Sequence, residues 1–217
     1  MATATGRYAV LTDMINRFMA LGESLTFIEV GTYNGYRAIK LCSEWIHRTN
    51  KPLNYIGFDL FEDMTRDVNT KELSKSTLPP SLAVVEKLFK QAKVPHRLIK
   101  GDTKITIPKF VAESNFNPRD PLLIFIDGGH SLETVASDWE ALSKLAGIYT
   151  VFIFDDYYEN KERFGCRETI TKLQQDPKWN VNLLNPVDRV ESSGLQIRMV
   201  QVTLRQPLDS PVEVQAA

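Results

Sequence analysis

Residues 25–35 read LTFIEVGTYNG, an apolar run that passes directly into a turn bounded by two glycines. The run Leu25–Val30 predicts a short buried β-strand, and the periodicity of residues 36–46 predicts a helix after the turn. Gly31 and Gly35 allow the backbone to turn tightly and to approach a ligand closely. Their GxxxG spacing lacks the middle glycine of the dinucleotide-binding GxGxxG motif, so the turn alone is also compatible with a purely structural connection.

The alternation of strand and helix continues outward from this unit. Apolar clusters bounded by turn residues predict further strands, and the unbroken run Leu122–Ile126 is typical of a parallel strand covered on both faces. We therefore predict an α/β fold with a doubly wound, mostly parallel, seven-stranded sheet and helices on both faces, a Rossmann-like arrangement. The predicted strands are residues 25–30, 54–59, 96–100, 122–126, 149–154, 179–184 and 195–204, and the predicted helices are residues 8–21, 36–46, 80–93, 107–114, 132–145 and 163–175.

Two segments do not follow this alternation. Residues 61–78 are polar, follow the second strand and are predicted to form an inserted loop or lid, because loops of this length in a compact domain are usually functional or disordered. Residues 206–217 are predicted to be a flexible tail. We expect residues 1–205 to form a single domain.

Composition and charge narrow the class of protein. The chain has 217 residues with 43% apolar and 24% charged side chains, the balance of a globular protein. A net charge of -1 provides no global field for nucleic acid or an anionic membrane, and no apolar run is long enough to span a bilayer. Cys42 and Cys166 are far apart and are expected to be buried rather than metal-bound. Without a signal-peptide pattern at the N-terminus, we expect a cytoplasmic protein that binds neither nucleic acid nor membrane.

The residues that follow each strand are the candidate ligand-binding residues, because ligands of open α/β sheets bind beyond the carboxyl ends of the strands. Glu29 precedes the glycine turn, where a carboxylate suits an amino group better than a pyrophosphate. Asp59 ends the second strand and can accept both hydroxyls of a ribose. Asp102 and Thr103 follow the third strand and can meet an adenine edge. Each of these polar residues can also serve only as a helix cap or turn residue, but together they favour an adenosine ligand.

Acidic residues gather after the fourth and fifth strands. Asp127 follows one strand and the pair Asp155–Asp156 follows the other, and neighbouring strands lie about 4.8 Å apart. Three carboxylates so close together are not comfortably ionised without a cation, and hard oxygen ligands suit Mg²⁺. In the alternative interpretation, one aspartate caps a helix, another faces water and no metal binds.

These motifs resemble those of class I S-adenosylmethionine-dependent methyltransferases, over residues 25 to 170. Phe27–Tyr36 resembles the first motif of enzymes similar to catechol O-methyltransferase, and Gly101-Asp102-Thr103 with Ile107-Pro108 resembles their adenine-binding turn. The acidic pair also resembles the metal site of macrocin-type sugar O-methyltransferases, in which an Asp-Asp-Tyr run is followed by Gly and Arg. The residues that match this order are Asp155, Asp156, Tyr157, Gly165 and Arg167.

The resemblance implies S-adenosylmethionine as cofactor and a role for each motif residue. Asp59 would hold the ribose, Asp102 and Thr103 the adenine, and Asp127 would also contact the cofactor. The methionine part would be held by Glu29 and the turn residues Gly31, Thr32, Tyr33 and Gly35. The implied ligands of Mg²⁺ are Asp127, Asp155 and Asp156.

His130 is the candidate general base, because an imidazole can accept a proton near neutral pH. Catechol-type relatives carry a lysine at the matching place, so this assignment extends beyond the resemblance. A structural role for His130 and the use of Asp127 as the base remain alternatives.

The sequence therefore predicts a Mg²⁺-assisted O-methyltransferase that acts on a hydroxyl of a small molecule. The acceptor is a sugar, a glycosylated metabolite or a catechol-like diol, and Gly165 and Arg167 slightly favour a sugar. A nicotinamide-dependent oxidoreductase, a non-catalytic binding protein and a metal-dependent hydrolase are the alternatives; the absent middle glycine and the acidic pair argue against the first. The helix at residues 8–21 can cover the site or mediate a homodimer.

Overall fold

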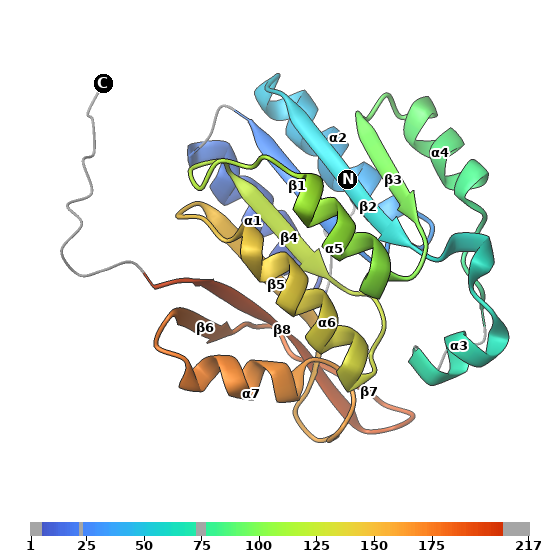
Figure 1. Ribbon diagram of the computed structural model, residues 1–217, viewed down its shortest axis with the longest axis vertical. Helices are drawn as coiled ribbons and strands as arrows, with labels where there is room; N and C mark the ends of the chain where they lie inside the picture. Colours follow the sequence, from blue (N-terminus) through green and yellow to red (C-terminus); the bar gives the residue numbers. More distant parts are fainter. Residues whose placement is uncertain (1–5, 22–23, 73–76, 206–217) are drawn as a thin grey trace.

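A single eight-stranded sheet forms the centre of the computed structural model, which describes residues 6–21, 24–72 and 77–205 (Figure 1). The strand order is β3-β2-β1-β4-β5-β8-β6, with β7 paired to β8. Strands β1 to β5 are parallel, and β8 is antiparallel to its neighbours. The strands are β1 (Leu25–Val30), β2 (Leu53–Asp59), β3 (His96–Lys100), β4 (Leu122–Ile126), β5 (Thr150–Tyr158), β6 (Trp179–Leu183), β7 (Asp188–Val190) and β8 (Leu195–Leu204).

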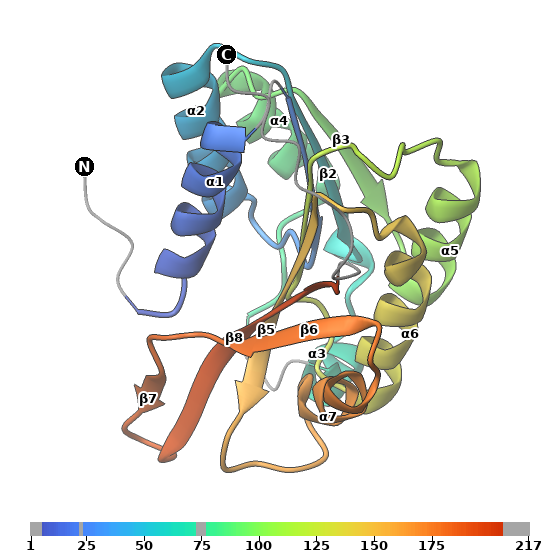
Figure 2. The ribbon, with the colours of Figure 1, turned by 90° about the vertical axis from the view of Figure 1, so that its left-hand side faces the viewer.

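Helices cover both faces of the sheet (Figure 2). Alternate residues of a strand enter opposite cores: Phe27 packs in the core under α1, α2 and α4, whereas Ile28 packs in the core under α5, α6 and α7. This arrangement confirms the predicted doubly wound fold. In the described ranges, no helix has the length and apolar character needed to cross a bilayer. The helices are α1 (Ala9–Leu21), α2 (Tyr36–Thr49), α3 (Arg66–Glu72), α4 (Leu82–Gln91), α5 (Thr103–Glu113), α6 (Leu132–Leu142) and α7 (Arg167–Gln175).

Two differences from the predicted sheet concern the strands beyond β4. The sequence analysis missed β7, because its three residues lie in a turn-rich stretch and give no alternating pattern. It also ended the fifth strand at Phe154, whereas β5 continues to Tyr158 by pairing with β8. The pairing register shifts between Phe154 and Tyr157, so the acidic pair lies at a bulge within the strand rather than after it. Asp156 adopts a positive φ of 56° at this irregularity.

The segment at residues 61–78 is not simply a polar loop. Phe61 is fully buried and begins a short 3₁₀ helix, η1 (Phe61–Asp63), which is followed by α3. The sequence analysis missed α3, because RDVNTKE has too few apolar residues for a helical period. Residues 73–76 of this segment and the predicted tail at residues 206–217 lie outside the described residues.

The ends of several helices are set by local backbone chemistry. Helix α5 begins at Thr103, before the predicted position 107, because the Asp102 carboxylate accepts a hydrogen bond of 2.9 Å from the Lys104 N–H. Helix α7 begins at Arg167 rather than at residue 163, since Arg163 and Gly165 both have positive φ. A second 3₁₀ helix, η2 (Ser143–Leu145), continues α6 over the rest of its predicted range.

Gly31 is the position at which the turn after β1 meets the end of β4. Its φ is 90°, and a Cβ atom built there would lie 2.1 Å from the carbonyl oxygen of Asp127. The Asp127 N–H in turn donates a hydrogen bond of 2.9 Å to the carbonyl of Val30. Only glycine combines this φ with this closeness at no steric cost, so the turn and Asp127 lie side by side.

We predict that Gly31→Ala lowers the free energy of unfolding by roughly 2–5 kcal/mol, because the added methyl group both strains the backbone and collides with Asp127. Gly194→Ala is the matched control: its φ is 67° but nothing lies within 4 Å of the added Cβ atom. The control should lose about 1 kcal/mol. Urea denaturation of both variants measures the difference, and equal losses would show that the close approach is unimportant.

Candidate functional site

A cavity of ≈ 280 Å³ lies at the carboxyl ends of β1, β2 and β4. Residues of the turn after β1, the end of β2, the start of α5 and the loop after β4 form much of its wall. This is the position at which open α/β sheets bind ligands. The predicted cofactor-binding residues that line the cavity are Glu29, Gly31, Thr32, Tyr33, Asp59, Asp102, Thr103 and Asp127.

Gly35 is the predicted cofactor residue that does not line this cavity. It precedes α2 with a φ of 70°, and a Cβ atom there would lie 2.6 Å from Cε2 of Phe89. Gly35 therefore shapes the turn and allows α2 and α4 to pack closely.

Glu29 is a buried acid in the cavity wall. The Tyr55 hydroxyl donates a short hydrogen bond to Oε2 of Glu29, and the same hydroxyl lies 3.1 Å from Oγ1 of Thr32. Burial raises the pKa of Glu29 to about 7, although the hydrogen bond from Tyr55 and the charge of Arg37 act to lower it. A cationic ligand would favour the ionised form of this buried carboxyl group, and its binding would therefore lower the pKa of Glu29.

Asp59 ties the end of β2 to the two segments around it. Its Oδ2 accepts a hydrogen bond of 2.6 Å from the Tyr33 N–H, and its Oδ1 accepts one of 2.8 Å from the Phe61 N–H. Each carboxylate oxygen has two acceptor sites, so hydrogen bonds from a diol remain compatible with these contacts.

The adenine-binding residues proposed from the sequence lie at the start of α5. Asp102 is the N-cap of this helix, as the alternative interpretation expected, and it also lines the cavity together with Thr103. Beneath them lies Asp138 of α6, which is 1% exposed. Neither of its carboxylate oxygens has a hydrogen-bond partner among the described residues, and the Thr103 hydroxyl is a neighbouring polar group. Burial raises the pKa of Asp138 to about 7.

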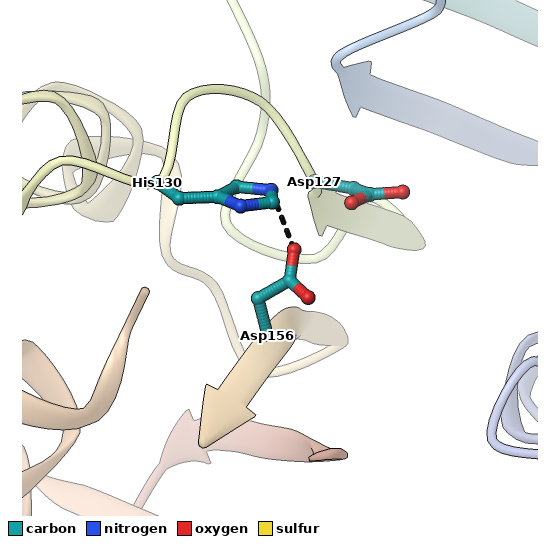
Figure 3. A group of neighbouring side chains, drawn as sticks. All are labelled: Asp127, His130 and Asp156. Carbon is teal, nitrogen blue, oxygen red and sulfur yellow. Dashed lines mark ion pairs between the residues drawn. The ribbon is translucent and has the colours of Figure 1, made fainter. Parts of the chain in front are cut away.

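Asp127, His130 and Asp156 come together beside the cavity (Figure 3). One potential ligand atom from each lies within 4.8 Å of the others, and Nε2 of His130 is 2.6 Å from Oδ2 of Asp156. Nδ1 of His130 is buried and has no hydrogen-bond partner in the part of the chain that the structure describes. Burial alone would raise the pKa of Asp156, but the close approach and charge of His130, together with the charge of Arg7, outweigh it and lower the pKa.

Asp155 does not share this arrangement, so the group differs by one residue from the predicted set of Asp127, Asp155 and Asp156. Its Oδ1 lies 2.6 Å from Nε of Arg7, and its Oδ2 accepts a hydrogen bond of 3.2 Å from Nη2 of the same guanidinium. Asp155 also accepts a hydrogen bond of 2.7 Å from the Asp156 N–H. At the bulge, Asp155 therefore pairs with Arg7, whereas Asp156 lies against His130.

A much smaller cavity of ≈ 10 Å³ lies between the ends of β4 and β5. Its volume is close to that needed by one water-sized particle. Asp127, Gly128 and Gly129 line both cavities, so this segment forms a shared wall between them. The acidic and imidazole side chains that line the small cavity are Asp127, His130, Asp155 and Asp156.

Gly165 fixes the backbone around this cluster. Its N–H donates a hydrogen bond of 2.7 Å to the carbonyl of His130, and a Cβ atom there would lie 2.1 Å from the carbonyl oxygen of Asp156. Arg167, the other residue of the macrocin-like pattern, donates a hydrogen bond of 2.9 Å to the carbonyl of Glu159. Both therefore have structural contacts that hold the segment after β5.

The sequence analysis missed several residues of the site. Tyr8 and Arg37 line the large cavity, and Nη1 of Arg37 lies 3.1 Å from Oδ2 of Asp127. The guanidinium carbon of Arg37 is 3.6 Å from the centroid of the Tyr8 ring. Arg37 could have been predicted as a site residue, because it lies in the first turn of the helix that follows the glycine turn, at the ligand-binding edge of the sheet. Arg7 and Tyr8 gave no such signal.

Helix α3 docks onto the loop after β4 through Glu72, another residue that was missed. Its carboxylate accepts hydrogen bonds of 3.1 Å and 3.0 Å from the N–H and hydroxyl of Ser131, and its carbonyl accepts one of 2.9 Å from the His130 N–H. The segment at residues 61–79 contributes Met64, Val68, Lys71, Glu72, Thr77 and Pro79 to the cavity wall.

A family model described as a methyltransferase domain matches residues 28–157, which is more than half of the chain. The matched range begins in β1 and ends at the bulge of β5, so it contains the glycine turn and the acidic cluster. The protein therefore belongs to this methyltransferase family. No curated protein sequence matches the chain.

Solved methyltransferases share the fold. The O-methyltransferase NovP is 17% identical, with a TM-score of 0.65 over 93% of this chain and 80% of that one. The O-methyltransferase TomG from Streptomyces achromogenes, solved with S-adenosylmethionine, is 13% identical, with a TM-score of 0.59 over 94% and 82% of the two chains. The methyltransferase PaMTH1 from Podospora anserina is 16% identical, with a TM-score of 0.55 over 94% and 81%. At these identities the likeness establishes the fold, that of the class I methyltransferases.

The raised pKa of Asp138 predicts a pH dependence of stability. Between its ordinary value of 3.8 and about 7 the unfolded chain releases a proton that the folded protein retains, so wild-type stability should fall as pH rises through this window. Asp138→Asn removes this loss, and its stability relative to wild type should rise by roughly 2–4 kcal/mol between pH 4 and pH 8. Chemical denaturation across this range measures the effect. The exposed Asp13→Asn is the control, and wild-type and Asp138→Asn curves that run parallel would contradict the prediction.

Proposed function

We propose that this protein is an S-adenosylmethionine-dependent O-methyltransferase that acts on a hydroxyl group of a small molecule. The observation that carries the proposal is the shared position of Asp127. It borders both the large cavity, lined by the residues expected to bind the methyl donor, and the small cavity at the acidic cluster. The proposed donor site and a group that can activate a hydroxyl would thus lie on either side of residues 127–129, which line both cavities.

The polar groups of the large cavity fit the three parts of the methyl donor. Glu29 would face the ammonium group, which explains a buried carboxyl without a cation directly bound to it. Asp59 would accept the ribose hydroxyls, and Asp102 and Thr103 would meet the adenine. The glycine turn, with its positive φ at Gly31, would let the backbone come close to the methionine part.

The proposed donor site predicts that affinity for S-adenosylmethionine rises with pH. Because the pKa of Glu29 is about 7 in the free protein, the carboxyl is protonated below this value and cannot pair with an ammonium group. The dissociation constant should therefore fall about tenfold between pH 6 and pH 7.5 and then level off. Isothermal titration calorimetry at several pH values tests this.

Glu29→Gln should bind the donor more weakly and without this pH dependence, whereas Glu44→Gln, on the surface of α2, should behave as wild type. Failure of the folded wild-type protein to bind S-adenosylmethionine at any pH would refute the proposed function. A nicotinamide cofactor would then be the next ligand to test.

The acidic cluster fits a divalent cation. Asp127 and Asp156 offer carboxylate oxygens within reach of one position, and the small cavity they line has room for a single ion or water. We propose Mg²⁺ as the ion, held by Asp127 and Asp156. A bound ion of this kind lowers the pKa of a hydroxyl and fixes its position.

His130 is then the residue that takes the proton of the acceptor hydroxyl. Its imidazole lies against Asp156, which orients the ring and stabilises its positive charge once the proton has arrived. His130 is buried, and the segment that carries it is held by the hydrogen bond between Ser131 and Glu72. Asp127 is the alternative base, since it lies on the donor side of the cluster.

Mn²⁺, which reports binding by electron paramagnetic resonance, tests the ion site independently of turnover. Asp156→Asn should weaken Mn²⁺ binding by about tenfold or more, because it removes a charged oxygen ligand. His130→Gln should bind Mn²⁺ nearly as wild type if the imidazole is the base. An equal loss in His130→Gln would instead make the histidine a ligand, and unchanged binding in Asp156→Asn would refute the site.

The acceptor we propose is a diol of a sugar, a glycosylated metabolite or a catechol, because two adjacent oxygens can chelate one ion. The O-methyltransferases TomG and NovP and the calicheamicin methyltransferase CalS11 support a small-molecule acceptor by their shared fold. The described residues of the predicted lid at residues 61–78 contribute to the cavity wall, which supports a role of this segment as a lid. Cys42 and Cys166 are buried free thiols, which supports the proposed cytoplasmic setting.

A further inference from the structure

Arg7 places a guanidinium inside the acidic cluster. Its Nε and Nη2 bind both carboxylate oxygens of Asp155, and its Nη2 lies 3.6 Å from Oδ1 of Asp156. Its side chain is 14% exposed, so the charge is largely removed from water. A two-point contact of this kind fixes geometry as well as charge.

The segment around Arg7 is anchored from a separate part of the chain. Asp188, at the start of β7, accepts a hydrogen bond of 3.0 Å from the Arg7 N–H and one of 2.9 Å from its Nη1. A Cβ atom on Gly6 would lie 2.7 Å from Oδ1 of Asp188, so the glycine allows this close contact. The guanidinium is therefore held between Asp155 on β5 and Asp188 on β7.

Each acid of the cluster has a basic side chain of the protein as a partner. Arg7 binds Asp155, Arg37 lies 3.1 Å from Asp127, and His130 lies 2.6 Å from Asp156. A divalent ion would enter a cluster that already contains positive charge. The guanidinium of Arg7 would repel such an ion, and it also occupies the carboxylate of Asp155, which otherwise resembles a third ligand.

We infer that Arg7 is a tethered cation that competes with the divalent ion for the acidic cluster. This inference rests on the ion site proposed above. With Arg7 on Asp155, only Asp127 and Asp156 offer carboxylates to the ion, and its binding is weak. When Arg7 leaves Asp155, the carboxylate of Asp155, which also lines the small cavity, loses its bound cation. Arg37 and His130 remain beside the other two acids.

The inference predicts that Arg7→Gln binds Mn²⁺ at least tenfold more tightly than wild type, measured by electron paramagnetic resonance of free Mn²⁺. Without the ion this variant should melt at a lower temperature than wild type, because Asp155 loses its partner. Addition of Mn²⁺ should raise its melting temperature by more than it raises that of wild type. Arg48→Gln removes an exposed arginine that is paired with Glu44 on α2, and it should change neither quantity.

Asp188→Asn provides a second route that leaves every side chain of the cluster in place. It loosens the anchor of Arg7 and should tighten Mn²⁺ binding by a smaller factor, about threefold. If Arg7→Gln does not fold, the Mn²⁺ affinity of Asp188→Asn tests the inference instead.

Mn²⁺ affinity in Arg7→Gln that equals or falls below that of wild type would overturn the competition. Titration of the same samples with S-adenosylmethionine separates this failure from that of the proposed function. Donor binding with unaltered Mn²⁺ affinity removes only the role of Arg7, whereas donor binding without Mn²⁺ binding in any variant removes the ion site as well. Absence of donor binding refutes the methyltransferase proposal itself.

Discussion

The contact between Gly31 and the carbonyl of Asp127 is the constraint on which the rest of the site depends. Strands β1 and β4 are neighbours in the sheet, but the turn after β1 reaches Asp127 only because Gly31 has no side chain and a φ of 90°. A larger residue would push the turn away from β4. The cavity residues on the turn would then separate from the cluster that begins at Asp127. The absence of a Cβ atom at Gly31 thus keeps the cavity residues of the turn close to the acidic cluster.

Charge pairing across the chain explains how the fold tolerates the adjacent acids Asp127, Asp155 and Asp156. Arg7 and Arg37 both lie near the Tyr8 ring, at 4.6 Å and 3.6 Å from its centroid, and each also binds an aspartate of the site. Burial raises the pKa of the Tyr8 hydroxyl well above its usual range, so the ring remains neutral between two cations. This stack connects the start of the chain to the ends of β4 and β5. Arg7 and Tyr8 are therefore in direct contact with the residues of the site.

The sequence was sufficient for the parallel half of the sheet, and the proposed cofactor-binding residues, apart from Gly35, all line one cavity. Continuous apolar runs such as Leu122–Ile126 mark buried strands clearly, and topology then brings their following residues to one edge. The antiparallel half was harder, because β7 is too short to show a pattern and the bulge in β5 depends on pairing with β8. Helix α3 owes its place to contacts of Glu72 with Ser131, which no local periodicity reports. The pattern of apolar residues thus predicts the strands and helices that bury their own apolar side chains. It does not predict elements that are held in place by polar contacts with distant residues.

Distant polar contacts also determine the state of the acidic cluster, so its sequence alone does not establish a metal site. Three carboxylates near one another do require a cation, but Arg7, which lies 148 residues before Asp155 in the chain, supplies one. A count of nearby acids therefore cannot distinguish a metal site from an internal salt-bridge network, since both satisfy the same electrostatics. The case for an ion depends instead on features that only the folded chain has: the convergence of Asp127, His130 and Asp156, and the small cavity that these side chains line. Arg7 pairs with Asp155 but does not line the small cavity. The cluster can therefore be neutralised by the guanidinium or by a metal ion, and the contact between Arg7 and Asp155 determines which of the two cations is favoured.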